Sequence, residues 1–218
     1  MAREPRFDQE ALDAVAKAVA AAEDRTAGEI VTYVVGECDP YPEALWRGGL
    51  YGALLAASIA ASVHATSGAW GASLLVWSLL PAFGGALLGM LAGDRIAPIR
   101  RLLVPNAALE RRVAMRAEAA FLEEEVFATR DRSGILLFLA LFEHRAVVLG
   151  DSGINQVVPQ AEWKGIVDDL VAGIRSGDAT GALVSAVERC GRLLEQRGVH
   201  IRPDDVDELR DAPRVRET

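Results

Sequence analysis

The chain has 218 residues, of which 51% are hydrophobic and 25% are charged, and its formal net charge is −8. This length is typical of one domain with an addition, and the acidic balance excludes a general nucleic-acid binder. The charges are unevenly spread, since no Asp, Glu, Lys or Arg occurs from Gly48 to Gly93. Such a gap argues against a protein that is soluble throughout, and the lack of other long apolar segments argues against a polytopic transporter.

The residues before the uncharged gap predict a helix followed by a strand. Residues 8–25 carry apolar side chains at helical spacing, and Asp8 stands where it can cap the helix. Residues 29–35 are β-branched and apolar, which is typical of a strand buried on both faces. No apolar leader precedes the helix, so we expect no cleaved signal peptide.

The uncharged gap predicts a transmembrane hairpin over 46–95, with spans at about 48–65 and 69–93. The first span is about 27 Å long as a helix, enough to cross the hydrocarbon core. Small residues recur at every fourth position of both spans: Gly48, Gly52, Ala56 and Ala60 on the first, and Gly85, Gly89 and Gly93 on the second. This stripe is typical of close helix packing, either between the two spans or between copies of the chain.

The charges beside the hairpin predict its orientation. Arg47 precedes the first span, Arg95, Arg100 and Arg101 follow the second, and the turn has no basic residue. By the positive-inside rule, both flanks and the rest of the chain face the cytoplasm. We therefore expect a two-span protein of the cell inner membrane with a cytoplasmic domain.

The residues after the hairpin predict further helices and a pair of strands. The expected order is a helix over 107–127, strands over 135–142 and 146–149, helices from 159 and over 178–197, and a disordered charged tail over 199–218. The strands are joined by so short a turn that they should pair antiparallel. Residues 8–40 and 107–198 together predict a discontinuous α/β domain, a small α/β/α sandwich with a mixed sheet.

Several motifs of this domain resemble the TPM domain family. They are Thr26-Ala27-Gly28-Glu29-Ile30-Val31 at the first strand, Ser133-Gly134-Ile135-Leu136-Leu137-Phe138 at the second, Glu143-His144-Arg145 in the turn, and Leu149-Gly150-Asp151-Ser152-Gly153-Ile154 after the third. The resemblance implies an α/β/α sandwich, divalent-cation binding in some members and an attributed phosphatase activity. The inserted hairpin looks like that of a bacterial membrane-anchored branch.

Three carboxylates are candidates for a metal site. Glu29 starts the first strand, Asp131 precedes the second and Asp151 follows the third, so all three should share one edge of the sheet. Carboxylate and carbonyl oxygens there could bind Ca²⁺ or Mg²⁺. The alternative is that Asp131 and Asp151 only form turns by bonding their own backbone. Cys38 and Cys190 lack the spacing of a zinc site, and we expect reduced thiols.

The sequence contains no clear nucleophile, P-loop or phosphate clamp, so the catalytic residues and the enzymatic status are open. We expect a membrane-tethered binding or accessory module that responds to a divalent cation. One alternative is a metal-dependent phosphatase, and another is an assembly protein that oligomerises through its glycine-rich spans. The expected partners are the lipid bilayer and either a membrane protein or a second copy of the chain, with no nucleic acid.

Overall fold

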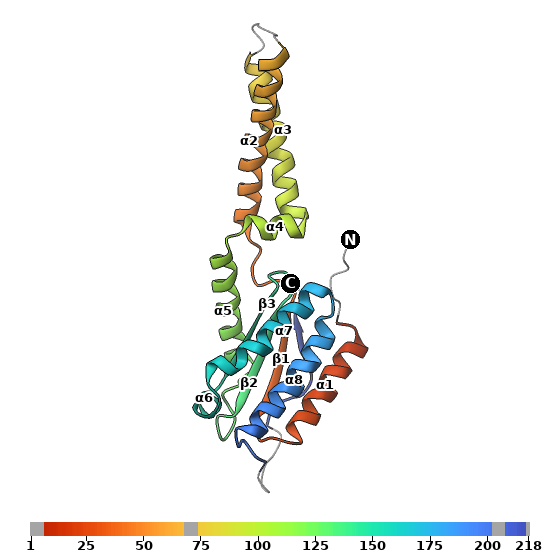
Figure 1. Ribbon diagram of the computed structural model, residues 1–218, viewed down its shortest axis with the longest axis vertical. Coiled ribbons are helices and arrows are strands. Elements are labelled where there is room, and N and C mark those ends of the chain that lie inside the picture. The colour runs from red at the N-terminus through yellow and green to blue at the C-terminus, as the bar shows by residue number, and fades with distance from the viewer. Residues whose placement is uncertain (1–6, 68–73, 202–207, 217–218) are drawn as a thin grey trace. The chain divides into compact units, whose positions relative to one another are not determined.

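The computed structural model describes residues 7–67, 74–201 and 208–216 (Figure 1). The chain divides into two compact units. One, the α/β unit, comprises Met1–Cys38 and Glu110–Thr218, and the other, the hairpin unit, comprises Asp39–Leu109.

The α/β unit is built on a four-stranded sheet of order β3-β2-β1-β4. The strands are β1 (Glu29–Val35), β2 (Gly134–Ala140), β3 (Arg145–Gly150) and β4 (Arg214–Arg216). β1 pairs parallel with both β2 and β4, whereas β2 and β3 pair antiparallel through a short turn. The mixed sheet and the antiparallel hairpin confirm what the sequence predicts.

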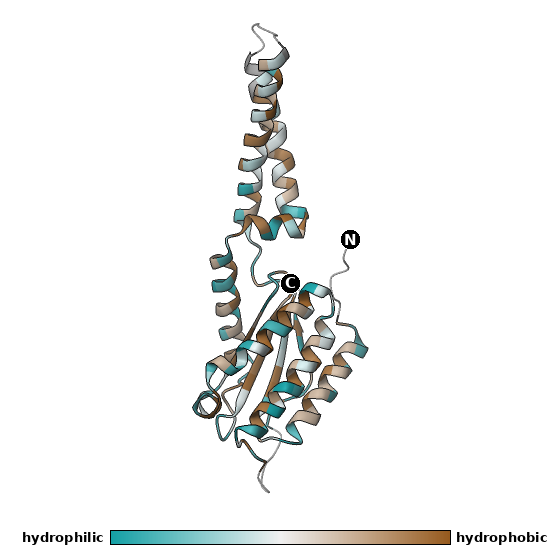
Figure 2. Ribbon diagram, viewed as in Figure 1, coloured by the Kyte–Doolittle hydropathy of each residue, from teal (hydrophilic) through white to brown (hydrophobic). Residues whose placement is uncertain are grey.

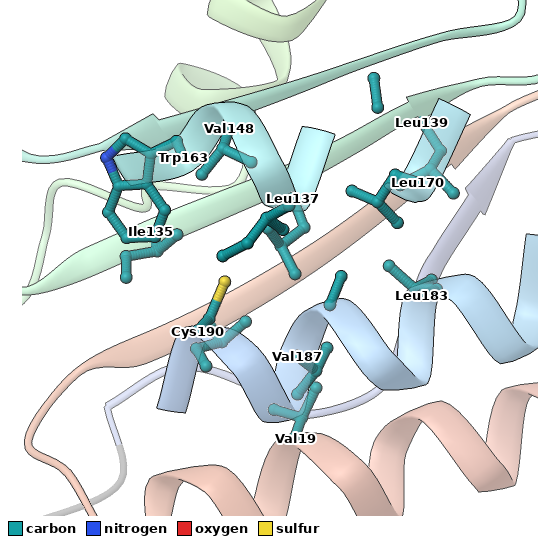
Figure 3. Packing of buried hydrophobic residues seen from close by; sticks show 14 of the residues in the cluster. Val19, Ile135, Leu137, Leu139, Val148, Trp163, Leu170, Leu183, Val187 and Cys190 are labelled. Carbon is teal, nitrogen blue, oxygen red and sulfur yellow. The ribbon is translucent and has the colours of Figure 1, made fainter. Parts of the chain in front are cut away.

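Three helices cover one face of the sheet: α1 (Gln9–Glu23), α7 (Trp163–Ser176) and α8 (Ala179–Gln196). Figure 3 shows their side chains meeting those of the central strands, with Leu137 and Leu139 from β2 facing Leu170 and Leu183. Asp8 caps α1 by accepting the Ala11 N–H, as the sequence predicts. Two short helices, α6 (Ser152–Val157) and a 3₁₀ turn (Gln160–Glu162), lead into α7.

Helix α5 (Asn106–Glu123) covers the opposite face. Val113, Ala117 and Ala120 of α5 pack on alternate residues of the strands, such as Tyr33 and Phe138. Because helices lie on both faces, every residue of β1 and β2 is buried. The three-layer α/β/α arrangement of the sequence prediction is therefore present.

The prediction of a disordered tail over 199–218 was wrong for residues 208–216. Arg214–Arg216 form β4 beside β1, and the N–H of Gly36 donates to the Arg216 carbonyl. The strand is held by charge as well as by backbone pairing, since Arg214 Nε lies 2.9 Å from Glu124 Oε2 and Arg216 Nη2 lies 3.4 Å from Glu123 Oε2. A charged, proline-containing segment has no apolar period, so its order depends on these partners at and just beyond the end of α5.

The hairpin unit contains α2 (Pro42–Ser67), α3 (Leu74–Arg95) and α4 (Ala97–Leu103). The predicted turn and the start of the second span lie largely outside the described residues. Glycine pairs bring α2 and α3 together, because a Cβ on Gly89 would lie 2.0 Å from the Gly48 carbonyl oxygen and one on Gly52 would lie 2.1 Å from that of Gly85. The small-residue stripe therefore packs the two helices of one chain, the first of the two uses predicted for it.

Large apolar side chains form the outer surface of this hairpin. Figure 2 colours many residues of α2 and α3 as hydrophobic. The exposed ones are Trp46, Leu50, Tyr51, Leu54, Leu55, Ile59 and Val63 on α2, and Trp77, Leu79, Leu80, Phe83, Leu87, Leu88 and Leu91 on α3. Among the described residues, Pro42–Thr66 is long and apolar enough to cross a membrane, and Leu79–Arg95 qualifies when α4 is counted with it. Length and composition thus allow one span or two.

Candidate functional site

One edge of the sheet, here called the loop edge, brings together the loop that enters β1 at Glu29 and two further loops, residues 131–134 and residues 150–153. Glu29 pairs in register with Gly134, and Ile135 pairs with Gly150. The Glu29 N–H donates to the Ser133 carbonyl at 3.2 Å, and the Asp151 N–H donates to that of Gly134 at 2.9 Å. The predicted convergence of the three loops is confirmed, although convergence alone does not make a cation site.

Glu29 is buried and holds the C-terminal segment. Its carboxylate accepts the backbone N–H groups of Glu208 and Leu209, at 3.3 Å and 3.2 Å. A carboxylate that accepts backbone N–H groups keeps its charge at little cost, because these donors replace water. The sequence places Glu29 at this edge but does not reveal that residues 208 and 209 supply these donors.

Asp151 is the second buried carboxylate, with only 5% of its side chain exposed. Its Oδ1 atom accepts the Ser152 N–H at 2.6 Å and caps α6, while Oδ2 lies 2.8 Å from Arg132 Nε. Arg132 adopts a left-handed backbone, with φ of 57°, a conformation that costs a non-glycine residue about 1 kcal/mol. The ion pair helps to offset this strain, and it gives Asp151 a structural role.

Asp131, the third candidate ligand, is exposed, in contrast to the other two. Among the residues that the structure describes, no three or more His, Cys, Asp or Glu side chains are grouped so that they could hold a metal ion. Glu29 and Asp151 already have protein partners, so the three side chains as placed do not fit Ca²⁺ or Mg²⁺. Binding of a cation at this edge stays a prediction, and no chemistry is derived from it.

The opposite edge of the sheet gathers Cys38, Glu143 and His144. Glu143 is almost fully buried, and its Oε1 atom accepts the Cys38 N–H at 2.8 Å. His144 occupies the turn between β2 and β3 with φ of 51°. The Glu143 carboxylate therefore ties the end of β1 to this turn, and His144 lies at the other end of the strands from Asp131 and Asp151.

Tyr33 forms a polar site that the sequence does not suggest. Its ring stacks on Phe138, and the guanidinium groups of Arg116 and Arg216 lie 5.1 Å and 5.7 Å from its centroid. Arg116 also donates to the Tyr33 hydroxyl oxygen. Burial raises the pKa of Tyr33, although the two arginines oppose the shift. The only sequence signal for Arg216 is the short Arg214-Val215-Arg216 alternation.

The stability of the α/β unit should therefore fall in strong base. A phenol whose pKa is higher in the folded chain contributes stability that is complete below its unfolded value of about 10 and is lost above it. From about pH 9 to about pH 11, we expect the free energy of unfolding in urea to fall more for the wild type than for Tyr33→Phe. Equal losses in the two proteins would contradict this assignment.

Neither Cys38 nor Cys190 forms a disulfide. Cys190 lies inside the core (Figure 3), where burial raises its pKa to about 12. A thiol with so high a pKa stays protonated and unreactive at neutral pH. Neither a nucleophilic nor a metal-binding role is supported for Cys190.

Fold and loop edge together define an α/β/α domain with a mixed sheet that is interrupted by a helical hairpin. Residues 94–193 match the sequence model of the TPM domain. The match runs from the end of α3 into α8 and includes residues 131–134 and 150–153 of the loop edge. The resemblance is thereby confirmed over somewhat less than half of the chain, and residues 8–40 lie outside the matched segment.

A solved structure shows the same fold. The NMR structure of the BA42 protein from the psychrophilic bacterium Bizionia argentinensis sp. nov. superposes with a TM-score of 0.58 at 18% sequence identity. The superposition covers 99% of this chain and 100% of that one. Likeness at this identity shows the fold alone, and no curated protein matches the chain in sequence.

Proposed function

We propose that this chain is a membrane-tethered TPM-like domain of the bacterial inner membrane, where it acts as a binding or accessory module. One observation carries the proposal, namely the reversed distribution of side chains in the hairpin unit. Glycines lie between α2 and α3, and large apolar side chains point outward. A water-soluble hairpin would place its large apolar side chains inside.

The energetic argument favours lipid around these helices. Each Å² of apolar surface left in water costs about 25 cal/mol, whereas the same surface costs nothing against lipid tails. Only 17% of the apolar 18-residue stretch within Pro42–Thr66 is buried. This helix therefore differs from the core helix of a soluble protein, which is mostly buried. Helices that pack through glycines gain van der Waals contact and need no hydrophobic effect between them.

Basic residues support a cytoplasmic orientation for both ends of the hairpin. Arg47 lies near the start of α2, and Arg95, Arg100 and Arg101 lie at or beyond the end of α3. Positive residues that flank spans remain on the cytoplasmic side. The outward apolar face leaves room for a membrane partner, either another protein or a second copy, whereas the glycine stripe is already used within the chain.

A binding role is favoured over catalysis because the buried carboxylates of the loop edge are engaged. Glu29 holds backbone N–H groups, and Asp151 caps α6 and pairs with Arg132. A metal-dependent phosphatase needs oxygen ligands that are free to hold its cation. No observation on the described residues favours that alternative.

The proposal is tested by placing charges on the outward face of the hairpin. Leu55 and Leu88 are 64% and 69% exposed. Leu55 lies near the centre of its span, where an arginine costs about 3 kcal/mol. We expect the wild type to resist alkaline carbonate extraction from membranes and Leu55→Arg/Leu88→Arg to be largely extracted. Met115→Arg/Leu122→Arg is the matched control, since these exposed side chains lie on α5 and should tolerate the charge. A wild type that carbonate removes completely would overturn the tether.

A further inference from the structure

The short helix α4 is fixed across the base of the hairpin. It is bent by 104° from Leu79–Arg95, so it runs nearly perpendicular to α3. Arg47 Nη1 donates to the Leu103 carbonyl at 2.9 Å, and Arg100 Nη2 donates to the Pro40 carbonyl at 2.9 Å. The Arg100 guanidinium also lies 5.9 Å from the centroid of the Tyr41 ring. These contacts set the direction of α4 relative to α2 and α3.

Helix α4 is amphipathic, although it is short. At 100° per residue, Ile99, Leu102 and Leu103 lie on one half of the helix, and Arg100 and Arg101 lie on the other. Leu103 packs toward the hairpin, because a Cβ on Gly48 or Gly93 would lie 3.3 Å or 3.2 Å from its Cδ1 atom. The apolar half of α4 is therefore the half turned toward α2 and α3.

Leu102 is the most exposed apolar side chain of α4, whereas Ile99 and Leu103 are partly buried. No residue of α4 is buried, and Leu102 is 84% exposed. The helix contains two arginines and no acidic residue. An exposed leucine beside two arginines, on a helix perpendicular to an apolar hairpin, matches the surface of an anionic bilayer in both polarity and charge.

We propose that α4 lies in the plane of the membrane surface and binds anionic phospholipid headgroups through Arg100 and Arg101. The inference rests on the proposed function, because α4 lies in that plane only if α2 and α3 cross the bilayer. Leu102 then reaches the boundary of the acyl chains, on the side where Leu103 meets the hairpin. The planar guanidinium of an arginine can bind two phosphate oxygens at once, which suits it to this contact.

The test measures the depth of residue 102 in full-length protein. Leu102→Cys, in a chain with Cys38→Ser and Cys190→Ala, carries an environment-sensitive dye and is reconstituted into vesicles of phosphatidylcholine or of phosphatidylcholine with phosphatidylglycerol. We expect quenching by lipids that carry a quencher near the headgroup, and stronger quenching when phosphatidylglycerol is present. Arg100→Gln/Arg101→Gln should reduce the ratio of membrane-bound to free α4 by tenfold or more, since each arginine contributes about fivefold at an anionic surface.

The control removes the same charge elsewhere. Arg175→Gln/Arg192→Gln, on α7 and α8, should leave the quenching unchanged. Flotation of the same vesicles reports the tether separately. A chain that floats while the dye at residue 102 stays in water overturns the α4 proposal alone, and so does equal quenching with and without phosphatidylglycerol. A chain that does not float overturns the tether and, with it, the role of α4.

Discussion

Replacing Gly89 by leucine should separate the two helices of the hairpin. A Cβ at this position would lie 2.0 Å from the Gly48 carbonyl oxygen and 2.7 Å from its carbonyl carbon, so the backbones themselves must move apart. Overpacking of a tight interface costs about 1–3 kcal/mol, and a collision with backbone rather than with a side chain puts this site at or above the upper end. Close contacts are lost along the whole stripe, because Gly52 and Gly85 meet in the same way.

The measurement is the distance between spin labels at residues 54 and 83, whose native side chains are exposed on α2 and α3. The wild type should give one narrow distance, and Gly89→Leu a longer and broader one. Gly84→Leu is the matched control, since nothing lies within 4 Å of a Cβ at Gly84. An unchanged distance in Gly89→Leu would show that the glycines do not hold the hairpin together.

Replacing Asp151 by alanine should destabilise the α/β unit by about 2 kcal/mol, because the change removes a helix cap and an ion pair together. The Ser152 N–H loses its acceptor, and Arg132 keeps its left-handed backbone without its partner. Arg132 is half exposed, so water can replace part of the lost interaction. Asp151→Asn keeps a capping oxygen and should cost less.

The free energy of unfolding in urea is measured with EDTA present, so that no divalent cation can contribute. Asp131→Ala serves as the control, because this exposed side chain should change stability by less than about 1 kcal/mol. If Asp151→Ala equals the wild type in EDTA and differs from it only with added Ca²⁺ or Mg²⁺, Asp151 is a cation ligand and its structural role is wrong.

Most of the α/β unit could be predicted from local patterns. The apolar stripe of α1, the β-branched and apolar residues of β1 and the continuous apolar run of β2 each predict burial, because each element meets a covered face. The short turn before Arg145 determines the antiparallel pairing of β2 and β3 in the same local way. These features depend on residues that are close together in the chain.

The features that could not be predicted depend on distant residues. β4 is ordered because Glu123, Glu124 and Glu29 provide partners for residues 208–216, and a polar segment carries no sign of such partners. The two arginines beside Tyr33 come from α5 and β4, which are both far from Tyr33 in the sequence. Helix α4 was missed because its short apolar pattern follows directly on that of α3.

For the candidate metal site, the positions of the carboxylates in the sequence predict where they lie but not whether they can bind a cation. The sequence places Glu29, Asp131 and Asp151 at one edge, and the strand register confirms this for the loops. Whether a carboxylate is free to bind a cation depends on its hydrogen bonds. Glu29 is engaged by the backbone of residues 208 and 209, and Asp151 by Ser152 and Arg132.

The most direct test of the account is the labelling of single cysteines from either side of the membrane. Glu10 and Thr66 are exposed, on α1 and at the far end of α2, and each is replaced by cysteine in a chain with Cys38→Ser and Cys190→Ala. With an impermeant maleimide, residue 66 should react from the periplasmic side of spheroplasts and residue 10 only from the cytoplasmic side, in inverted vesicles. Reaction of both residues from the same side would contradict a hairpin that crosses the membrane.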